Sequence, residues 1–194
     1  MKKLEVTDIS KTYKETKALQ NVSFCLEENK IYGLLGRNGA GKTTLLNIIN
    51  NRVFADNGTI TLNGEDVKEN DTLLRQFYFT SEKTLFPDAM KVKDIFRWTK
   101  EFYPDFDADY ALRISELFGL PLKKKSSALS TGYMSILKNV LALSVNTPYI
   151  FLDEPVLGLD ANHRELFYKL LIEKYSENPF TIVISTHLIE EVSN

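Results

Sequence analysis

Residues 36–43 read Gly-Arg-Asn-Gly-Ala-Gly-Lys-Thr and carry the most specific chemical pattern in this chain. A glycine and four free positions precede Gly41-Lys42-Thr43, which is the template of a phosphate-binding loop. Closely packed phosphate oxygens need several converging N–H donors and a cation, and a glycine-rich turn lets the backbone approach them. A helix that starts at the loop adds the positive end of its dipole. The spacing therefore predicts a site for a nucleoside triphosphate.

The loop template assigns roles to individual residues. We expect Lys42 to reach the β- and γ-phosphates, and we expect the Thr43 hydroxyl to be a ligand of Mg²⁺. The other positions expected to contact the nucleotide are Gly36, Asn38, Gly39, Ala40, Gly41 and Thr44.

The flanking segments have the periodicities that this motif requires. Residues 31–35 form a short apolar run that is typical of a buried strand. Residues 44–49 are typical of a helix start with apolar side chains on the inner face, and we expect this helix to end near residues 50–51. Strand, loop and helix in this order is the context in which the motif binds phosphate.

Two further apolar runs end in polar residues. Residues 149–152 lead to Asp153 and Glu154, and residues 181–184 lead to His187. Continuous apolar runs are typical of parallel strands buried on both faces, and ligands bind at the carboxyl edge of such sheets. We expect Asp153 to hold the Mg²⁺ shell and Glu154 to polarise the attacking water. His187 is either a structural histidine or a donor to the γ-phosphate.

The remaining patterns predict an α/β protein. We expect strands at 3–9 and 21–27 with a turn at 16–20, followed by strands at 59–62 and 76–80 between turn signals. The pattern becomes helical from 88 to 146. One face of the first helix there carries Val92, Ile95, Phe96 and Thr99, and Trp98 is expected in the core; the second helix carries Ala111, Leu112, Ile114, Ser115 and Phe118.

The predicted architecture is a P-loop NTPase core with an N-terminal antiparallel β subdomain and an inserted α-helical subdomain. Residues 1–194 form one domain, in which 1–87 and 147–194 make the α/β core with its β subdomain and 88–146 make the helical subdomain. A length of 194 residues and an apolar content of 43% suit one compact domain with an ample core.

Composition excludes several classes of protein. No run approaches the roughly 18 consecutive apolar residues of a membrane span, and the N-terminus lacks the apolar region of a secretory signal. Cys25 is the single cysteine, so we expect a small core or interface residue and not a redox site. The net charge of −2 gives no electrostatic case for nucleic acid, and Lys123-Lys124-Lys125 is expected to be a solvated linker.

Residues 129–134, Leu-Ser-Thr-Gly-Tyr-Met, lie where a loop enters a predicted helix. Ser130 suits the N-cap position, and the new N-terminus offers unpaired N–H groups that could meet an anion. From these residues alone, an ordinary helix cap is the simpler interpretation.

The order of the motifs resembles that of the ATP-binding subunits of ABC transporters over nearly the whole chain. The likeness rests on the phosphate loop, on Leu129-Ser130-x-Gly132 at the signature position, on the strand ending in Asp153-Glu154, on Leu157-Gly158-Leu159-Asp160 as the D-loop, and on His187 as the switch histidine. Tyr13 falls where the family stacks an aromatic ring on adenine, although taken alone it would be a strand-end tyrosine.

This resemblance implies ATP and Mg²⁺ as cofactors and a head-to-tail dimer with ATP between one subunit's phosphate loop and the other's signature helix. Ser130 and the Gly132 N–H would bind the γ-phosphate in trans, and Asp160 would carry communication across the dimer. The implied partners are a second ATP-binding subunit, identical or different, and membrane-spanning subunits. The chain would lie peripherally at the cytoplasmic face of the membrane, most like bacterial exporter subunits.

Two other classes of protein share parts of this pattern. A soluble ABC-type ATPase of the translation or DNA-repair kind carries tandem domains or long coiled-coil insertions, and the sequence has neither. A kinase or GTPase would share only the phosphate loop, and the sequence lacks an Asn-Lys-x-Asp segment that reads guanine.

The chain also departs from the family pattern. Thr131 stands where the signature has a second glycine, and Tyr133 stands where it has a glutamine. The Q-loop glutamine should fall near Ser81, with Glu82 as a substitute. We therefore expect a slower trans half of the site. We also expect the chain to end at Asn194 inside a helix. Because family members continue past the switch histidine, this end predicts a truncated or naturally shortened domain.

Overall fold

The computed structural model describes residues 2–83 and 86–187, which fall into two compact units. The first unit comprises residues 2–79, 148–153 and 180–187, and the second comprises the described residues of 80–147 and 154–179. Residues 154–179, which follow the strand ending at Asp153, therefore belong to the second unit. The expected helix at the end of the chain lies outside the described residues.

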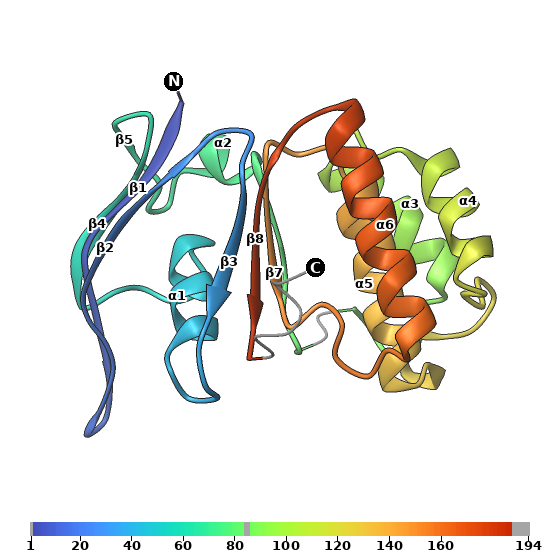
Figure 1. Ribbon diagram of the computed structural model, residues 1–194, viewed down its shortest axis with the longest axis horizontal. Coiled ribbons are helices and arrows are strands. Elements are labelled where there is room, and N and C mark those ends of the chain that lie inside the picture. Colours follow the sequence, from blue (N-terminus) through green and yellow to red (C-terminus); the bar gives the residue numbers. More distant parts are fainter. Residues whose placement is uncertain (1, 84–85, 188–194) are drawn as a thin grey trace. The chain divides into compact units, whose positions relative to one another are not determined.

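An antiparallel sheet in the order β2-β1-β4-β5 opens the first unit (Figure 1). Its strands are β1 (Lys3–Tyr13), β2 (Thr16–Glu27), β4 (Asn57–Leu62) and β5 (Glu65–Asp66). The prediction of a turn at 16–20 was wrong, because β1 and β2 form a long hairpin that turns at residues 14–15. Lys14 takes the left-handed φ of 54° that the turn needs, at a position without the glycine or asparagine that usually signals it.

The second sheet of this unit has the order β3-β8-β7-β6. Its strands are β3 (Ile31–Leu35), β8 (Thr181–Thr186), β7 (Tyr149–Asp153) and β6 (Phe77–Thr80). β8 pairs in parallel with β3 on one side and β7 on the other, and every residue of β7 and β8 is buried, as predicted. β3 lies at the edge, and Ile31 and Leu35 are 42% and 45% exposed, so its prediction as a fully buried strand was wrong.

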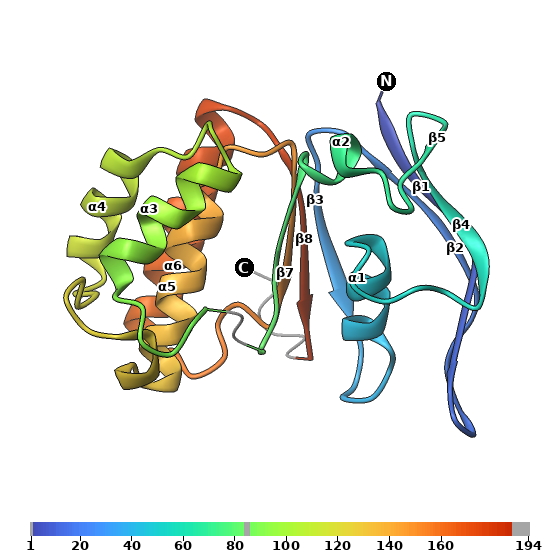
Figure 2. The same cartoon turned by 180° about the vertical axis from the view of Figure 1, so that it is seen from behind.

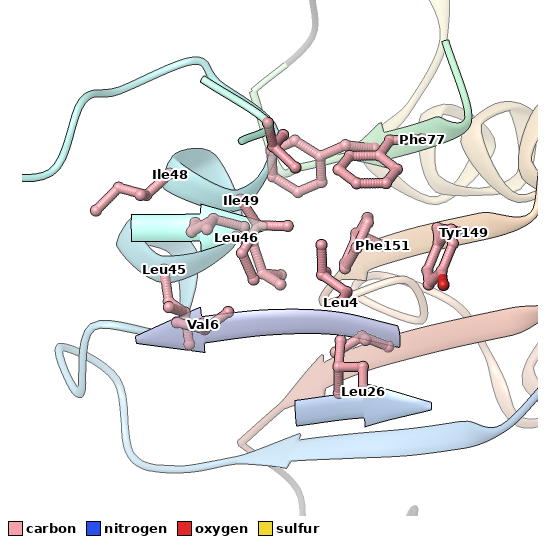
Figure 3. Close-up of a cluster of buried hydrophobic side chains, with 14 of the residues drawn as sticks. Leu4, Val6, Leu26, Leu45, Leu46, Ile48, Ile49, Phe77, Tyr149 and Phe151 are labelled. Atoms are coloured by element: carbon pink, nitrogen blue, oxygen red, sulfur yellow. The ribbon is translucent and has the colours of Figure 1, made fainter. Parts of the chain in front are cut away.

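Helix α1 (Lys42–Ile49) packs its apolar face into the core of the first unit. Figure 3 shows Leu45, Leu46, Ile48 and Ile49 of this helix with Leu4, Val6 and Leu26 from the antiparallel sheet and Phe77, Tyr149 and Phe151 from the second sheet. Burial of a large apolar side chain contributes about 1.5–3 kcal/mol, so this packing firmly fixes the helix that starts at the phosphate loop. A short helix, α2 (Asp71–Leu74), connects the two sheets and was not predicted.

The second unit is helical. It contains α3 (Val92–Phe102), α4 (Ala108–Leu117), the 3₁₀ helix η1 (Ser126–Ala128), α5 (Thr131–Ser144) and α6 (Ala161–Glu177). Helix α5 packs against α3, α4 and α6 (Figure 2). None of the helices within residues 2–83 and 86–187 has the length and apolar character that a membrane crossing requires.

Three surface predictions can be compared with the structure. The predicted face of α3 is buried, but the prediction that Trp98 lies in the core was wrong, because it is 51% exposed. Trp98 lies one turn before Phe102, which is 66% exposed, and the two rings form an edge-to-face pair on the outer face of the helix. Cys25 is exposed on β2, which excludes a core position for it. Residues 123–125 are exposed, as expected for a solvated linker.

Candidate functional site

The phosphate loop lies between β3 and α1 in the first unit. Its lysine, Lys42, is only 8% exposed and donates hydrogen bonds to the carbonyl oxygens of Gly36 at 2.7 Å and Arg37 at 3.4 Å. Gly41 precedes the helix with φ of 87°, and a Cβ added there would lie 2.5 Å from the Ala18 carbonyl oxygen. Glycine is therefore required at this position both for conformation and for space. The loop therefore has a defined conformation in which the Lys42 ammonium group contacts the loop's own backbone.

The residues predicted to contact the nucleotide differ in their exposure. Asn38, Gly39 and Ala40 at the tip of the loop and Thr43 at the helix start are exposed, whereas Gly36, Gly41 and Thr44 are partly buried. Exposed backbone N–H groups at the start of a helix of eight residues are the arrangement that an anion needs.

Thr43 and Asp153 meet although 110 positions separate them in the sequence. The Thr43 hydroxyl donates to Asp153 Oδ2 at 2.6 Å, and the Ser185 hydroxyl makes a very short contact with Asp153 Oδ1. Asp153 is 5% exposed, and Ser185 is its registered neighbour on β8. Both carboxylate oxygens are thus oriented by hydroxyl groups. Sequence reasoning missed Ser185, although it is the hydroxyl that strand pairing places beside Asp153.

The Thr43–Asp153 pair suits a magnesium ion. A hydroxyl and a carboxylate are hard oxygen ligands, and Mg²⁺ commonly takes one or two protein oxygens and completes its shell with water and phosphate oxygens. Within the described residues, no group of three or more histidine, cysteine, aspartate or glutamate side chains could hold a metal ion. A magnesium ion at the Thr43–Asp153 pair would take its remaining ligands from water and from phosphate oxygens.

Two other predicted residues belong to the first unit. Tyr13 ends β1, and its side chain is 45% exposed, with the Lys11 ammonium 5.5 Å from the ring centroid. His187 directly follows β8 and is exposed. Because β8 runs parallel to β7, His187 and Asp153 emerge at the same carboxyl edge of the sheet.

Glu154 is the next residue after Asp153 and opens a loop of the second unit. It has φ of 51°, a left-handed conformation that is uncommon for a residue with a Cβ. The loop ends at Asp160, which caps α6 by accepting a hydrogen bond from the His163 backbone N–H at 2.9 Å. This N–H and the His163 ring, also at 2.9 Å, lower the pKa of Asp160.

Helix α5 begins at the segment that sequence reasoning singled out. Ser130 is its N-cap, as predicted, and accepts a hydrogen bond from the Tyr133 N–H at 3.3 Å. A Cβ added to Gly132 would lie 2.7 Å from the Gly158 carbonyl oxygen, so only glycine allows this close approach of helix and loop. The Thr131 side chain lies beside Gly158 as well. The signature-position helix therefore touches the loop that carries Glu154 and Asp160.

Further along α5, three polar side chains hold backbone carbonyls, and sequence reasoning did not anticipate them. The Ser135 hydroxyl donates to Leu157 O at 2.7 Å, and the Asn139 amide donates to Pro155 O at 2.9 Å. Lys138 donates from one ammonium group to two consecutive carbonyls of the segment at 81–82, Ser81 O at 2.7 Å and Glu82 O at 2.8 Å. The signal in the sequence is a set of polar residues within an otherwise apolar helix.

The segment at 81–83 contacts the Lys138 ammonium group through its backbone carbonyls. Ser81 is 8% exposed, and burial lowers the pKa of Lys138, while the negative charge of Glu82 opposes this shift.

A glycine-rich loop that starts a core helix, a hydroxyl–carboxylate pair beside it and a serine-capped signature-type helix define a phosphate-loop ATP-binding cassette. A family model described as ABC transporter matches residues 19–157, and the chain belongs to this family.

Individual relatives agree with this assignment. The chain is 33% identical to the ABC transporter ATP-binding protein YtrB of Bacillus subtilis (strain 168), over 97% of this chain but 65% of that protein. It is also 33% identical to the putative ABC transporter ATP-binding protein AlbC of the same organism, over 97% of this chain and 83% of that protein. A solved ATP-binding subunit of an ABC transporter is 26% identical, with a TM-score of 0.82 over 96% of this chain and 80% of the other. The chain thus spans less than two thirds of YtrB.

Proposed function

We propose that this chain is the ATP-binding subunit of an ABC transporter. It binds ATP with Mg²⁺ and hydrolyses it at a head-to-tail dimer interface, and this drives transport by separate membrane subunits. The observation that carries the proposal is the 2.6 Å contact between Thr43 and Asp153, which joins the phosphate loop to the end of a buried strand in a member of this family.

In the binding step, the backbone N–H groups of the loop and the start of α1 surround the phosphates. The Lys42 ammonium leaves the Gly36 and Arg37 carbonyls and moves to the β- and γ-phosphate oxygens, exchanging neutral acceptors for charged ones. Thr43 and Asp153 hold Mg²⁺, which neutralises charge on the phosphates when it is bound. The exposed Tyr13 ring stacks on adenine.

In the hydrolytic step, Glu154 orients the attacking water and accepts its proton, and His187 donates a hydrogen bond to the γ-phosphate. The carboxylate is suited to this task because Asp153, its neighbour, is already committed to two hydroxyl groups. The two adjacent acids thus have separate roles, one that orients the metal and one that receives a proton.

The second half of the site comes from another subunit. Ser130 and the N–H of Gly132 bind the γ-phosphate of that subunit's ATP, and Asp160 carries communication across the dimer. A chain with this role associates with membrane-spanning subunits at the cytoplasmic face of the membrane. The names of the relatives favour this role over a soluble ABC-type ATPase of the translation or DNA-repair kind.

The test is Glu154→Gln, with Glu165→Gln on the exposed surface of α6 as the matched control. Loss of a general base lowers turnover by about 10²–10⁴-fold. We expect steady-state ATP hydrolysis by the purified chain to fall by at least roughly a hundredfold. ATP affinity should be retained, and an ATP-bound dimer should accumulate in size-exclusion chromatography. Wild-type turnover in Glu154→Gln would refute the assignment of the catalytic carboxylate, whereas the control should match the wild type.

A further inference from the structure

Asn139 is a polar residue in the most buried part of α5. Its side chain is 0% exposed, and its Nδ2 donates to the Pro155 carbonyl oxygen at 2.9 Å. Because a carbonyl can only accept, the amide nitrogen and not the oxygen must face it. Pro155 directly follows Glu154, so Asn139 hydrogen-bonds to the backbone one residue away from the proposed catalytic carboxylate.

The loop that Asn139 grips has a costly conformation. Glu154 has φ of 51° and Gly158 has φ of 77°. A left-handed residue with a Cβ persists only where its surroundings hold it in place, and such positions concentrate at functional sites. Ser135 lies one helical turn from Asn139 on the same face of α5 and donates to Leu157 O at 2.7 Å. Two side chains of one helix therefore hold the loop at two carbonyl oxygens, those of Pro155 and Leu157.

The oxygen of the Asn139 amide indicates that this side chain adds little to the free energy of unfolding. Its Oδ1 atom is buried and has no hydrogen-bond donor among the residues that the structure describes. A buried acceptor without a donor costs about as much as a hydrogen bond gains, so the net stabilisation from this side chain is small. An apolar residue of the same size would remove this unpaired acceptor but would also leave the buried Pro155 carbonyl oxygen without its donor, so the two effects on stability oppose each other. The asparagine is therefore better explained by the position that it imposes on the loop.

We propose that Asn139 is a positioning residue for Glu154. Its hydrogen bond fixes the Pro155 peptide, which fixes the left-handed Glu154 and thereby the direction of its carboxylate. Ser135 supports the same loop from Leu157. The role in hydrolysis rests on the proposed function of Glu154, whereas the hold on the loop does not.

The test compares Asn139→Leu with Ser144→Ala. Leu keeps the approximate volume and removes the donor. Ser144 is equally buried in α5, but its hydroxyl bonds within the helix, to Val140 O at 2.7 Å, so this control loses a buried hydrogen bond without touching the loop. We expect kcat for ATP to fall roughly tenfold to a hundredfold in Asn139→Leu, because small misplacements of a catalytic group have effects of this size. KM for ATP should stay the same. Tm should change little, because the variant removes the unpaired Oδ1 acceptor and leaves the Pro155 carbonyl oxygen unpaired in its place.

Hydrogen exchange of the loop supplies a readout that does not need ATP. The Leu157 N–H bonds to Glu154 O at 3.1 Å and reports the closed loop. In Asn139→Leu its exchange should accelerate several-fold, while amides of α6 remain protected. Ser144→Ala should change neither property.

Each result bears on a different step. Wild-type exchange at Leu157 in Asn139→Leu would refute the hold on the loop, and faster exchange with unchanged kcat would refute positioning. A lowered Tm with faster exchange throughout the unit would show a structural role only. Ser135→Ala, which removes one hydroxyl, should give the same effects in weaker form and replaces Asn139→Leu if that variant does not fold. If Glu154→Gln hydrolyses ATP normally, the proposed function fails. The exchange of the Leu157 amide then still shows whether Asn139 orders the loop.

Discussion

The phosphate loop and the start of α5 are both N-termini of helices, but they are stabilised in different ways. In the phosphate loop, the chemical groups contact one another or their own backbone: Thr43 bonds to Asp153, and Lys42 bonds to Gly36. In the signature segment, Ser130 and Gly132 are positioned by a helix whose other side chains hold the carbonyls of two loops.

The proposed reacting groups therefore also order the phosphate loop, whereas in the signature segment other side chains of the helix hold the backbone. In the phosphate loop, we expect a single substitution to remove both a reacting group and the contact that orders it. In the signature half, we expect side chains that hold backbone carbonyls, such as Lys138, to influence activity through the backbone. The family departures Thr131 and Tyr133 both lie in this second half. We therefore expect variation in rate between related proteins to arise there and not in the phosphate loop.

The largest effect is expected from Lys42→Ala. Each charge-assisted hydrogen bond is worth about 1.5–3 kcal/mol, so the loss of contacts to two phosphates should weaken ATP binding by roughly a hundredfold or more. Equilibrium binding of a fluorescent ATP analogue measures this effect. Lys30→Ala, at an exposed lysine before β3, is the control. Unchanged ATP affinity in Lys42→Ala would refute the role of this lysine and remove the contrast between the two halves.

The fold followed from the sequence wherever a periodicity was strong. The runs at 149–152 and 181–184 are buried parallel strands because no polar residue interrupts them. The hairpin turn at 14–15 was missed because Lys14 adopts a left-handed conformation that lysine does not signal. Trp98 was misplaced because the expectation rested on its aromatic side chain alone. One residue turns a helix by about 100°, so position 98 lies off the buried face that carries Val92 and Thr99.

The candidate site was predicted to the extent that its residues lie in contiguous motifs. The phosphate loop, Asp153 and the Ser130 cap were identified from local patterns. Ser185 required strand register, and Asn139 required knowledge of which carbonyl faces α5. Both are tertiary relations between distant segments, and one sequence does not encode them as a local signal.

An intermediate effect is expected from Gly132→Ala, which tests the close approach of α5 to the Gly158 carbonyl. The added Cβ would lie 2.7 Å from that oxygen, and neither partner is a flexible side chain. We expect a loss of about 1–3 kcal/mol in the free energy of unfolding, as for other overpacked positions. Hydrolysis should fall as well, because the signature helix and the loop of Glu154 are forced apart. Thr131→Gly is the matched change at the preceding residue, and it should leave the free energy of unfolding within about 1 kcal/mol of the wild type. A stable, active Gly132→Ala would show that the two segments do not depend on each other.

The smallest effect is a pH dependence at Lys138, measured against Lys138→Met by urea unfolding between pH 7 and 10.5. Burial lowers the pKa of Lys138 from its ordinary value of 10.5, so the folded chain releases this proton at a lower pH than the unfolded chain. Between those two values the unfolded state binds more protons, and the free energy of unfolding must rise with pH. The stability of the wild type relative to the variant should therefore be lowest near neutral pH and increase towards pH 10.5. Lys30→Met, at an exposed lysine, should show no such slope. If the stability of the wild type relative to Lys138→Met instead decreased with pH, the charged ammonium group would stabilise the segment at 81–82 by more than its burial costs. The contact of Lys138 with two carbonyls would then be a stabilising charged contact, like that of Lys42 in the phosphate loop.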